Sequence, residues 1–372
     1  MIRRALIPCL AALALAACAV PPPKAMPQPS APPPPPAASA PTPEAVPHVR
    51  DFSIARAEFV RATAQRFGIP AAEIEAVLAK AQLRDSIIAA MSRPAEAKPW
   101  RDYRPIFIQQ KRIDGGRAFL AANRDALQRA EDTYGVPKEI ITAILGVETS
   151  YGGNKGSYPV IDALYTLAFA YPRTGDPAKA AREDQREKFF RDELAQLFAL
   201  GKEEGLDIAA LKGSYAGAMG WGQFMPSSYR DYAVDGDGDG KRDLFNDLDD
   251  VFASVANYFA KKGGWKGKAP VMTRAARDPG AADFVNPGNS VTLDQTLASL
   301  QAKGYRPVDL RFVSTDSGPA ATLITLDGAT GPEYWIVYNN FKAITTYNIS
   351  RLYATAVYQL AETIAGRDPD PA

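Results

Sequence analysis

The stretch from residue 135 to residue 153 constrains the fold of this chain more than any other. Pro137 suits the first turn of a helix, where its missing N–H costs nothing, and a Gly-Gly pair marks the end of the stretch. About two turns of nearly unbroken apolar surface lie between these limits, formed by Ile140, Ile141, Ile144, Leu145 and Val147. The pattern predicts a helix around which the rest of the chain is organised.

Glu148 lies on the same face of this helix as its most apolar residues, because Ile141, Ile144 and Leu145 precede it by seven, four and three positions. An apolar environment disfavours the ionised form of a carboxyl group and raises its pKa, so Glu148 could donate a proton near neutral pH. The alternative is a glutamate near the helix C-terminus that simply reaches solvent. This stretch alone leaves both interpretations open.

Residues 1–17 have the features of a secretory signal peptide: two arginines, an apolar run too short to span a membrane, and then small residues. The end of this segment resembles the bacterial lipoprotein signal, in which the cysteine, here Cys18, is lipidated and becomes the mature N-terminus. Ala19 rather than Asp follows, which by resemblance to Gram-negative lipoproteins favours a periplasmic protein anchored to the inner leaflet of the outer membrane. An ordinary cleaved signal is the alternative.

Residues 18–50 are predicted to join the lipidated cysteine to the folded body. Residues 21–47 hold 13 of the 31 prolines in the chain, a composition typical of an extended, polyproline-like spacer that forms no core. Such a spacer would hold the folded body away from the membrane surface.

Composition excludes several kinds of chemistry. Cys9 and Cys18 belong to the signal sequence and the single histidine, His48, lies outside the folded part, so disulfides, thiol nucleophiles, Ser-His-Asp or Cys-His catalysis and His/Cys zinc sites are excluded. Removal of residues 1–17 lowers the formal charge from +1 to −1, which gives no support for nucleic acid as a partner.

A second unusual stretch covers residues 213–229. Four glycines fall within ten residues of it, at positions 213, 217, 220 and 222. This density costs conformational entropy, which the close approach of a ligand to the backbone could offset. The large side chains between these glycines suit stacking on sugar rings, and they are Tyr215, Met219, Trp221 and Phe224. A tightly packed turn between helices is the alternative.

The acidic loop at residues 235–246 matches most of an EF-hand calcium loop, including the turn glycine, Gly240. At position 12 of the pattern, Asn246 replaces the bidentate glutamate, so we expect weak Ca²⁺ affinity. An Asp-Gly-rich surface turn without metal is the alternative. The candidate ligands are Asp235, Asp237, Asp239, the carbonyl of Lys241, Asp243 through water, and Asn246.

Several motifs in this order resemble the lytic murein transglycosylase B family of membrane-bound peptidoglycan lyases. The match covers residues 51 to about 360. The motifs are G-V-E-T at 146–149, the stretch 213–229, the acidic loop, S-V-A-N-Y-F at 254–259 and N-N-F…I-T-x-Y-N at 339–348.

The resemblance implies an α+β, mainly α fold with a lysozyme-like catalytic core. Strand-like runs at 308–313, 321–326 and 334–338, with a helix near 293–303, independently indicate a small α+β insert. The expected parts are an N-terminal helical domain at 51–100, the catalytic core at 101–265, the insert at 266–335 and a C-terminal core helix at 336–366.

The resemblance also implies the site residues, with Glu148 as the sole catalytic acid and base. Residues 174–188 are longer than the family has at this place, which affects the groove wall beside Arg173. The positions implied to contact the glycan are Tyr103, Arg173, Ser214, Gln223, Tyr258, Asn340 and Tyr347.

Two-carboxylate glycosidases need a second acidic group across the sugar, and no second carboxylate lies in a comparable sequence setting. The implied reaction therefore uses the substrate's own N-acetyl oxygen and ends in 1,6-anhydromuramic acid, with peptidoglycan glycan strands as the partner of a monomer that acts alone or with other cell-wall enzymes. Alternatives are a non-catalytic glycan-binding lipoprotein with a calcium-stabilised fold and a hydrolytic muramidase.

Overall fold

The computed structural model describes residues 52–92, 98–286, 290–309 and 320–370, all within one compact unit. The predictions for the signal peptide, Cys18, the linker at 18–50 and the end of the strand expected at 308–313 lie outside the described residues. Among the described helices, none combines the length and the apolar composition needed to cross a membrane.

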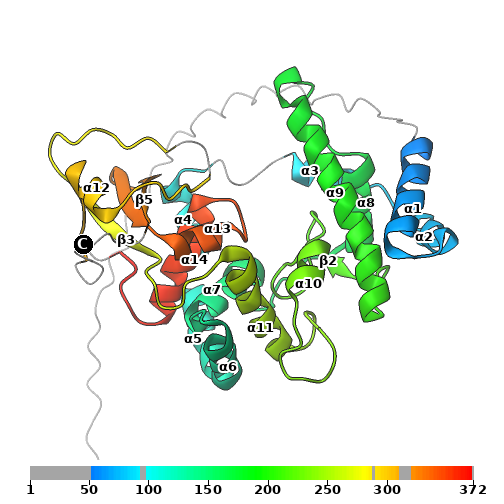
Figure 1. The fold of residues 1–372 in the computed structure, drawn as a ribbon, viewed down its shortest axis with the longest axis horizontal. Helices are drawn as coiled ribbons and strands as arrows, with labels where there is room; N and C mark the ends of the chain where they lie inside the picture. The colour runs from blue at the N-terminus through cyan, green and yellow to red at the C-terminus, as the bar shows by residue number, and fades with distance from the viewer. Residues whose placement is uncertain (1–51, 93–97, 287–289, 310–319, 371–372) are drawn as a thin grey trace, which may run out of the picture. The chain divides into compact units, whose positions relative to one another are not determined.

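Helices make up most of the described structure (Figure 1). The helices before the glycine-rich stretch are α1 (Ser53–Phe67), α2 (Ala71–Leu78), α3 (Asp85–Met91), α4 (Trp100–Phe107), α5 (Gln110–Ala122), α6 (Arg124–Tyr134), α7 (Lys138–Thr149), α8 (Val160–Phe169) and α9 (Pro177–Glu204). The later ones are α10 (Pro226–Tyr232), α11 (Leu248–Tyr258), the π-helical η2 (Phe259–Gly263), α12 (Leu297–Ala302), α13 (Asn339–Thr345) and α14 (Arg351–Ile364).

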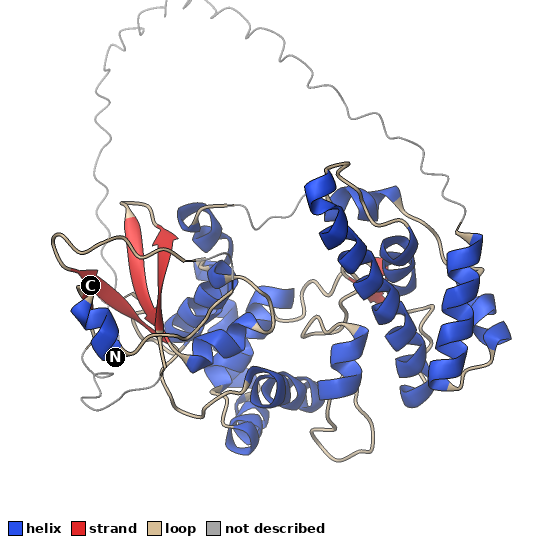
Figure 2. Ribbon diagram, turned by 45° about the horizontal axis from the view of Figure 1, so that its top comes forward, coloured by secondary structure: helices blue, strands red, loops and turns tan. Residues whose placement is uncertain are grey.

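A four-stranded antiparallel sheet lies between η2 and α13 in the chain, and Figure 2 shows its strands together at one end of the compact unit. Its strand order is β4–β3–β6–β5, and Val337 of β6 is paired with Met272 of β3 and Thr322 of β5. A short pair, β1 (Tyr158–Pro159) and β2 (Lys212–Gly213), flanks α8 and α9. The strands of the sheet are β3 (Met272–Arg277), β4 (Tyr305–Pro307), β5 (Thr322–Asp327) and β6 (Pro332–Val337).

The sheet agrees in part with the sequence prediction. The runs expected at 321–326 and 334–338 correspond to β5 and β6, and the helix expected near 293–303 corresponds to α12, which Thr296 caps. The sequence analysis missed β3, because M-T-R-A-A-R contains only one β-branched residue and no alternation of polar and apolar side chains. The α+β, mainly α class is confirmed.

Helix α7 lies inside the hydrophobic core, as its composition predicts. Ile141, Ile144 and Leu145 are completely buried, and α7 packs against α5, α6, α11 and α14. One continuous core cluster extends from Phe59 in α1 to Ile364 in α14, while a second, smaller cluster lies within the sheet region. Burial of so many large apolar side chains on one helix fixes the position of its C-terminal end, where Glu148 lies.

Two helix boundaries differ from the sequence prediction. Helix α7 ends at Thr149 rather than at the Gly-Gly pair, because Ser150 and Tyr151 adopt left-handed conformations with φ of 51° and 58°. The apolar residues Phe189, Phe190, Leu194 and Leu197 predict a helix over residues 183–204, but α9 begins at Pro177, since the side chain of Asp176 accepts a hydrogen bond from the N–H of Ala178. The Asp-Pro pair at 176–177 was the signal for this start.

Candidate active site

The end of α7 is fixed against α5 by Tyr151. The hydroxyl of Tyr151 donates a hydrogen bond to the carbonyl of Arg112 at 2.9 Å, and its ring stacks on Phe119 at 5.5 Å between centroids. A Cβ atom at Gly146 would come within 2.6 Å of the Tyr151 hydroxyl, and one at Gly116 would also overlap it. A side chain at Gly146, the glycine of the G-V-E-T motif, would displace Tyr151. This glycine is therefore needed so that Tyr151 can pack against the last turn of α7, which carries Glu148.

Thr149 joins the same helix end to the glycine-rich stretch. Its hydroxyl donates to the carbonyl of Trp221 at 3.1 Å and accepts from the N–H of Gly152 at 3.0 Å. The Trp221 indole lies against Gly152, where a side chain would overlap it, and donates to the carbonyl of Phe245 at 3.1 Å. The glycine-rich stretch is thus attached directly beside Glu148.

Glu148 is partly buried, and loss of solvation raises its pKa from 4.5 to about 7. The hydroxyl of Tyr353, in the first turn of α14, donates a hydrogen bond to Oε1 of Glu148 and opposes this rise. Tyr353 is 3% exposed, and burial together with the neighbouring Glu148 charge raises its pKa well above the ordinary value. A single carboxyl group with a pKa near 7 could both donate and accept a proton at neutral pH.

The sequence analysis did not find Tyr353. Its partner Glu148 is 205 positions away in the chain, so no local pattern connects the two residues. The available signal was its spacing: it follows Tyr347 by six positions and sits in the first turn of a helix that Ser350 caps.

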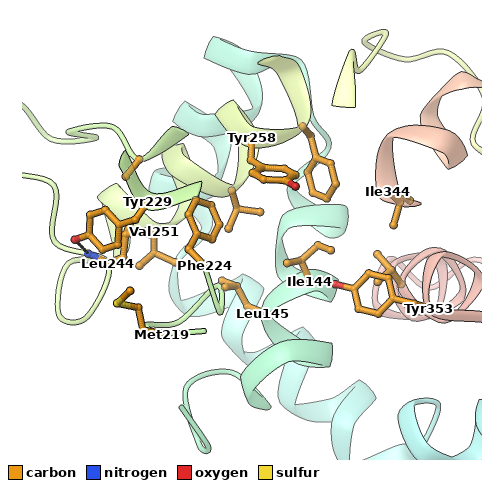
Figure 3. Close-up of a cluster of buried hydrophobic side chains, with 14 of the residues drawn as sticks. Ile144, Leu145, Met219, Phe224, Tyr229, Leu244, Val251, Tyr258, Ile344 and Tyr353 are labelled. Carbon is orange, nitrogen blue, oxygen red and sulfur yellow. Dashed lines mark hydrogen bonds between the residues drawn. The ribbon is translucent and has the colours of Figure 1, made fainter. Parts of the chain in front are cut away.

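Three aromatic side chains connect the glycine-rich stretch to α11 and to the segment between α13 and α14. They are Phe224 and Tyr258, both labelled in Figure 3, and Tyr347. Tyr258 and Tyr347 meet edge to face at 4.9 Å between ring centroids, and Phe224 lies 5.7 Å and 5.9 Å from them. The Tyr347 hydroxyl donates to the carbonyl of Gly222 at 2.6 Å, and the Tyr258 hydroxyl donates to the carbonyl of Thr346 at 2.7 Å. The hydrogen bond from Thr149 to Trp221 attaches the glycine-rich stretch to the helix end that carries Glu148. Burial and the Glu148 charge both raise the pKa of Tyr347.

Gln223 adopts a strained backbone conformation in this cluster. Its φ of 52° is uncommon for a residue other than glycine. Its side-chain amide holds the conformation by donating to the carbonyls of Gly220 at 3.0 Å and Lys155 at 3.2 Å. Strain of this kind concentrates at functional sites, where it fixes the direction of a side chain.

The structure brings four of the predicted glycan-contacting residues into the neighbourhood of Glu148. Gln223 and Tyr347 are joined through Gly222, and Tyr258 packs on Tyr347. Tyr103, which is 5% exposed, belongs to α4, and α4 packs against α14, the helix that carries Tyr353.

The remaining three predicted contacts are engaged within the protein. Ser214 accepts hydrogen bonds from the N–H groups of Ala216 and Ala218. The Arg173 guanidinium pairs at 2.7 Å with both Asp184 and Glu187, which belong to the longer segment at 174–188 that forms the start of α9.

Asn340 is completely buried, and both ends of its amide are hydrogen-bonded to the backbone where the chain leaves the core for the sheet. Its Oδ1 accepts from the N–H of Lys266 at 2.8 Å, and its Nδ2 donates to the carbonyl of Ala269 at 2.8 Å. The neighbouring Asn339 donates to the carbonyl of Gly264 at 2.7 Å. We therefore do not retain Asn340 as a glycan contact, because its side chain joins the two ends of the insert.

The acidic loop brings together a different set of carboxylates from the one that the EF-hand pattern predicts. Carboxylate oxygens of Asp235, Asp237 and Asp250 lie within 4.8 Å of one another, a donor set that fits a hard divalent cation. Asn246, predicted as a ligand at position 12, instead turns its side chain to the carboxylate of Asp243 at 2.9 Å. Asp235 and Asp237 are among the predicted ligands, whereas Asp239 is not part of this group of carboxylates. The predicted carbonyl ligand of Lys241 stays a prediction.

Asp250, which the sequence analysis missed, lies in the first turn of α11 and is 1% exposed. Its two carboxylate oxygens accept hydrogen bonds at 2.6 Å from the N–H groups of Gly236 and Asp243. An acidic residue directly before an apolar run was the available signal, because an unpaired buried carboxylate is costly.

A protein-family model described as the transglycosylase SLT domain matches residues 51–362. The membrane-bound lytic murein transglycosylase B of Escherichia coli K12 is 36% identical over 318 residues, which is 83% of this chain and 82% of that protein.

Solved structures agree with this match. Catenated lytic transglycosylase SltB1 from Pseudomonas aeruginosa has a TM-score of 0.74 and 43% identity, over 84% of this chain and 97% of that one. Escherichia coli lytic transglycosylase Slt35 in complex with calcium has a TM-score of 0.73 and 36% identity, over 85% of this chain and 94% of that one. Pseudomonas aeruginosa SltB3 in complex with NAG-anhNAM-pentapeptide has a TM-score of 0.71 and 31% identity, over 85% of this chain and 80% of that one.

Proposed function

The chain belongs to the transglycosylase SLT domain family and is a lytic transglycosylase, a lyase that acts on peptidoglycan; from this premise we propose that Glu148 is its sole catalytic acid and base. The observation that carries the proposal is the Glu148 carboxyl group at the end of a buried helix, with a pKa of about 7 and one oxygen held by Tyr353. A group that is half protonated at neutral pH is suited to donate and then accept the same proton.

The other largely buried carboxylates among the described residues support a single-residue mechanism, because each is engaged in structural contacts. Asp162 pairs with Arg84, Glu183 accepts from Thr174, Glu193 accepts from Ser227, and Asp250 accepts from the acidic loop. None of these four offers the second carboxyl group that a hydrolase of the two-carboxylate type requires.

The proposed reaction cleaves the β-1,4 bond between N-acetylmuramic acid and N-acetylglucosamine. Protonated Glu148 gives its proton to the glycosidic oxygen as the bond to C1 breaks, and the substrate's N-acetyl oxygen bonds to C1. The Glu148 carboxylate then takes the proton of the C6 hydroxyl, whose oxygen displaces the N-acetyl oxygen from C1 and closes a 1,6-anhydro ring. Atoms balance without water, and Glu148 ends protonated as it began.

The Tyr353 hydrogen bond would stabilise the carboxylate between these two proton transfers, since a hydrogen bond to the charged form favours it. It also occupies Oε1, which leaves Oε2 to exchange the proton with the substrate. We propose that Gln223, Tyr258, Tyr347 and Tyr103 contact the sugars beside the scissile bond. Arg173 and Ser214 are proposed to contact more distant parts of the strand.

We propose that Asp235, Asp237 and Asp250 hold a Ca²⁺ ion, as the calcium complex of Slt35 suggests for a related chain. The ion would supply positive charge that neutralises three close carboxylates. It would thereby join the acidic loop to α11, and it has no part in the proton transfers.

We also propose a lipid anchor on Cys18, with the enzyme in the periplasm at the inner leaflet of the outer membrane; the membrane-bound relative supports the attachment to a membrane. The family member in complex with a peptide-bearing disaccharide supports peptidoglycan strands as the substrate of this chain. We keep the division into an N-terminal helical domain, a catalytic core and an inserted α+β domain as part of this proposal.

The chemical identity of the sugar ends that the enzyme produces tests the proposal. Mass spectra of digested sacculi should contain 1,6-anhydromuramic acid ends, lighter by one water than hydrolytic ends. Glu148→Gln keeps the shape of the side chain but removes proton exchange, so activity should fall by about 10²–10⁴-fold or more. Reducing ends, or substantial activity in the variant, would overturn the assignment.

A further inference from the structure

The glycine-rich stretch contains four large side chains that suit sugar stacking, and the structure separates one of them from the other three. Met219 is completely buried and Phe224 is 2% exposed (Figure 3). Trp221 is partly buried, with Phe119 at 5.9 Å on its ring and the Lys155 ammonium at 5.2 Å. Tyr215 is 37% exposed.

Tyr215 stands at the tip of a rigid turn. The hydroxyl of Ser214 accepts hydrogen bonds from Ala216 at 3.3 Å and Ala218 at 3.1 Å, and the N–H of Gly217 donates to the Ser214 carbonyl at 3.0 Å. Gly217 has a φ of +83° and lies against Leu164 of α8, where a side chain would overlap. These contacts hold the backbone on both sides of Tyr215.

A rigid turn that displays an exposed aromatic ring is costly unless the ring has a partner. Exposed apolar surface loses the stabilisation that burial gives, and the left-handed Gly217 adds a conformational requirement. Because the backbone on both sides of Tyr215 is already held, a ligand that covers the ring orders little additional backbone.

This turn is continuous with the catalytic neighbourhood. Isolated β-bridges pair Gly213 with Met219 and Met219 with Phe224, so the turn and the residues after it form one small unit. Gly222 in this unit accepts the hydrogen bond of Tyr347 beside Glu148. Tyr215 therefore belongs to the same loop that borders the reacting group but lies at its far end.

We propose that Tyr215 forms a sugar-stacking subsite for a glycan residue that lies away from the scissile bond. The C–H face of a pyranose ring covers the aromatic ring, while the phenol hydroxyl stays in water. The proposal rests on the proposed function and extends it: the enzyme should prefer long glycan strands to short ones, through binding rather than through the chemical step.

The test measures binding and turnover separately. Peptide-free glycan strands of two lengths are titrated into the protein in the Glu148→Gln background, where binding is observed without cleavage. Tyr215→Ala should weaken binding of the long strand by about 3- to 10-fold and leave the short strand unchanged, since aromatic contacts contribute about 0.5–1.5 kcal/mol. In the otherwise wild-type enzyme, the same change should raise KM for long strands with kcat unchanged.

Two further variants distinguish the ring from other effects. Tyr215→Phe keeps the ring and should bind like the parent protein. Phe189→Ala removes a ring of similar exposure, 39%, on α9 and should not alter binding. Equal affinity of the parent and Tyr215→Ala for the long strand would overturn the subsite, and so would an equal loss in Tyr215→Phe. Failure of the parent to bind any strand would instead contradict the proposed function.

Discussion

Glu148 combines a catalytic requirement with a cost in stability. Its pKa rises from 4.5 to about 7 on folding, so between these values the native protein holds a proton that the unfolded chain has released. Stability therefore falls as pH rises through this window, by up to about 3 kcal/mol above pH 7. An active site that needs a neutral carboxyl group must accept this loss.

Glu148→Gln should remove the pH-dependent part of that cost. The variant should melt at a higher temperature than the wild type above pH 7, and the difference should shrink toward pH 4.5 because the wild-type carboxyl is then protonated in both states. Thermal melts across this range provide the measurement. A difference that does not vary with pH would contradict desolvation as the cause of the raised pKa.

Tyr353 should set the position of the pH optimum. Its hydrogen bond lowers the pKa of Glu148 against the effect of burial. Tyr353→Phe should therefore raise that pKa, and the alkaline limb of kcat/KM should move up by about one pH unit, because Glu148 stays protonated longer.

Tyr338→Phe is the matched control for this prediction. The Tyr338 hydroxyl is buried without a hydrogen-bond partner among the described residues, and Tyr338 packs in the second core cluster. Its removal should leave the pH profile in place. A profile that does not move in Tyr353→Phe would show that the hydrogen bond has no role in the titration of Glu148.

At the scale of elements, the sequence could predict what is encoded locally. The apolar spacing of α7 identified the buried helix, because period and burial coincide within two turns. The spacing placed Glu148 on the apolar face but left its burial open, and its role came from the family resemblance. The end of α7 was predicted three to four residues too late, since Tyr151 inserts below Gly116 and Gly146, and this is a tertiary contact. Tyr353 reaches Glu148 from α14 for the same kind of reason, without a local signal.

The first turns of α9 change the setting of one predicted site residue. Asp184 and Glu187 of this helix pair with Arg173 at 2.7 Å, and the Arg173 side chain is 15% exposed. Glu187 also pairs with Arg191, so the guanidinium is held within a network of charges rather than left open to solvent. The longer segment was visible in the sequence, but its pairing with Arg173 depends on how α9 packs on α8.

Asp250 should decide the response of the acidic loop to calcium. Ca²⁺ that binds the native state alone raises the melting temperature with its concentration. Asp250→Asn should remove most of this rise, because the residue supplies the one buried carboxylate of the group. Asp239→Asn, on the same loop but outside the group, is the control and should retain it. The structural assignment would be wrong if the two variants behaved alike or if chelator did not change the wild-type melt.

At the scale of the whole molecule, the insert leaves and re-enters the core at neighbouring points. Gly263 of η2 lies against Ala343 of α13, and a Cβ at Gly263 would come within 3.0 Å of the Ala343 side chain. Asn339 and Asn340 hydrogen-bond the departing backbone at residues 264–269. The core cluster can thus continue from α11 to α14 although residues 264–338 lie between η2 and α13 in the chain.

The N-terminal segment, residues 1–50, is predicted to attach the enzyme to a membrane. Residues 49–372 form one compact unit, and its core cluster includes residues of α1. If residues 1–50 serve only to attach the enzyme to a membrane, Cys18→Ala should release it into the soluble periplasmic fraction with its activity on isolated sacculi unchanged. Cell fractionation followed by a sacculus-clearing assay on each fraction provides the measurement.

Cys9→Ala is the matched control, because this cysteine lies within the predicted signal peptide and its removal should leave the enzyme in the membrane fraction. A Cys18→Ala enzyme that still sediments with membranes would place the anchor elsewhere, and one that loses activity on free sacculi would show that the N-terminal segment contributes to the fold or the site.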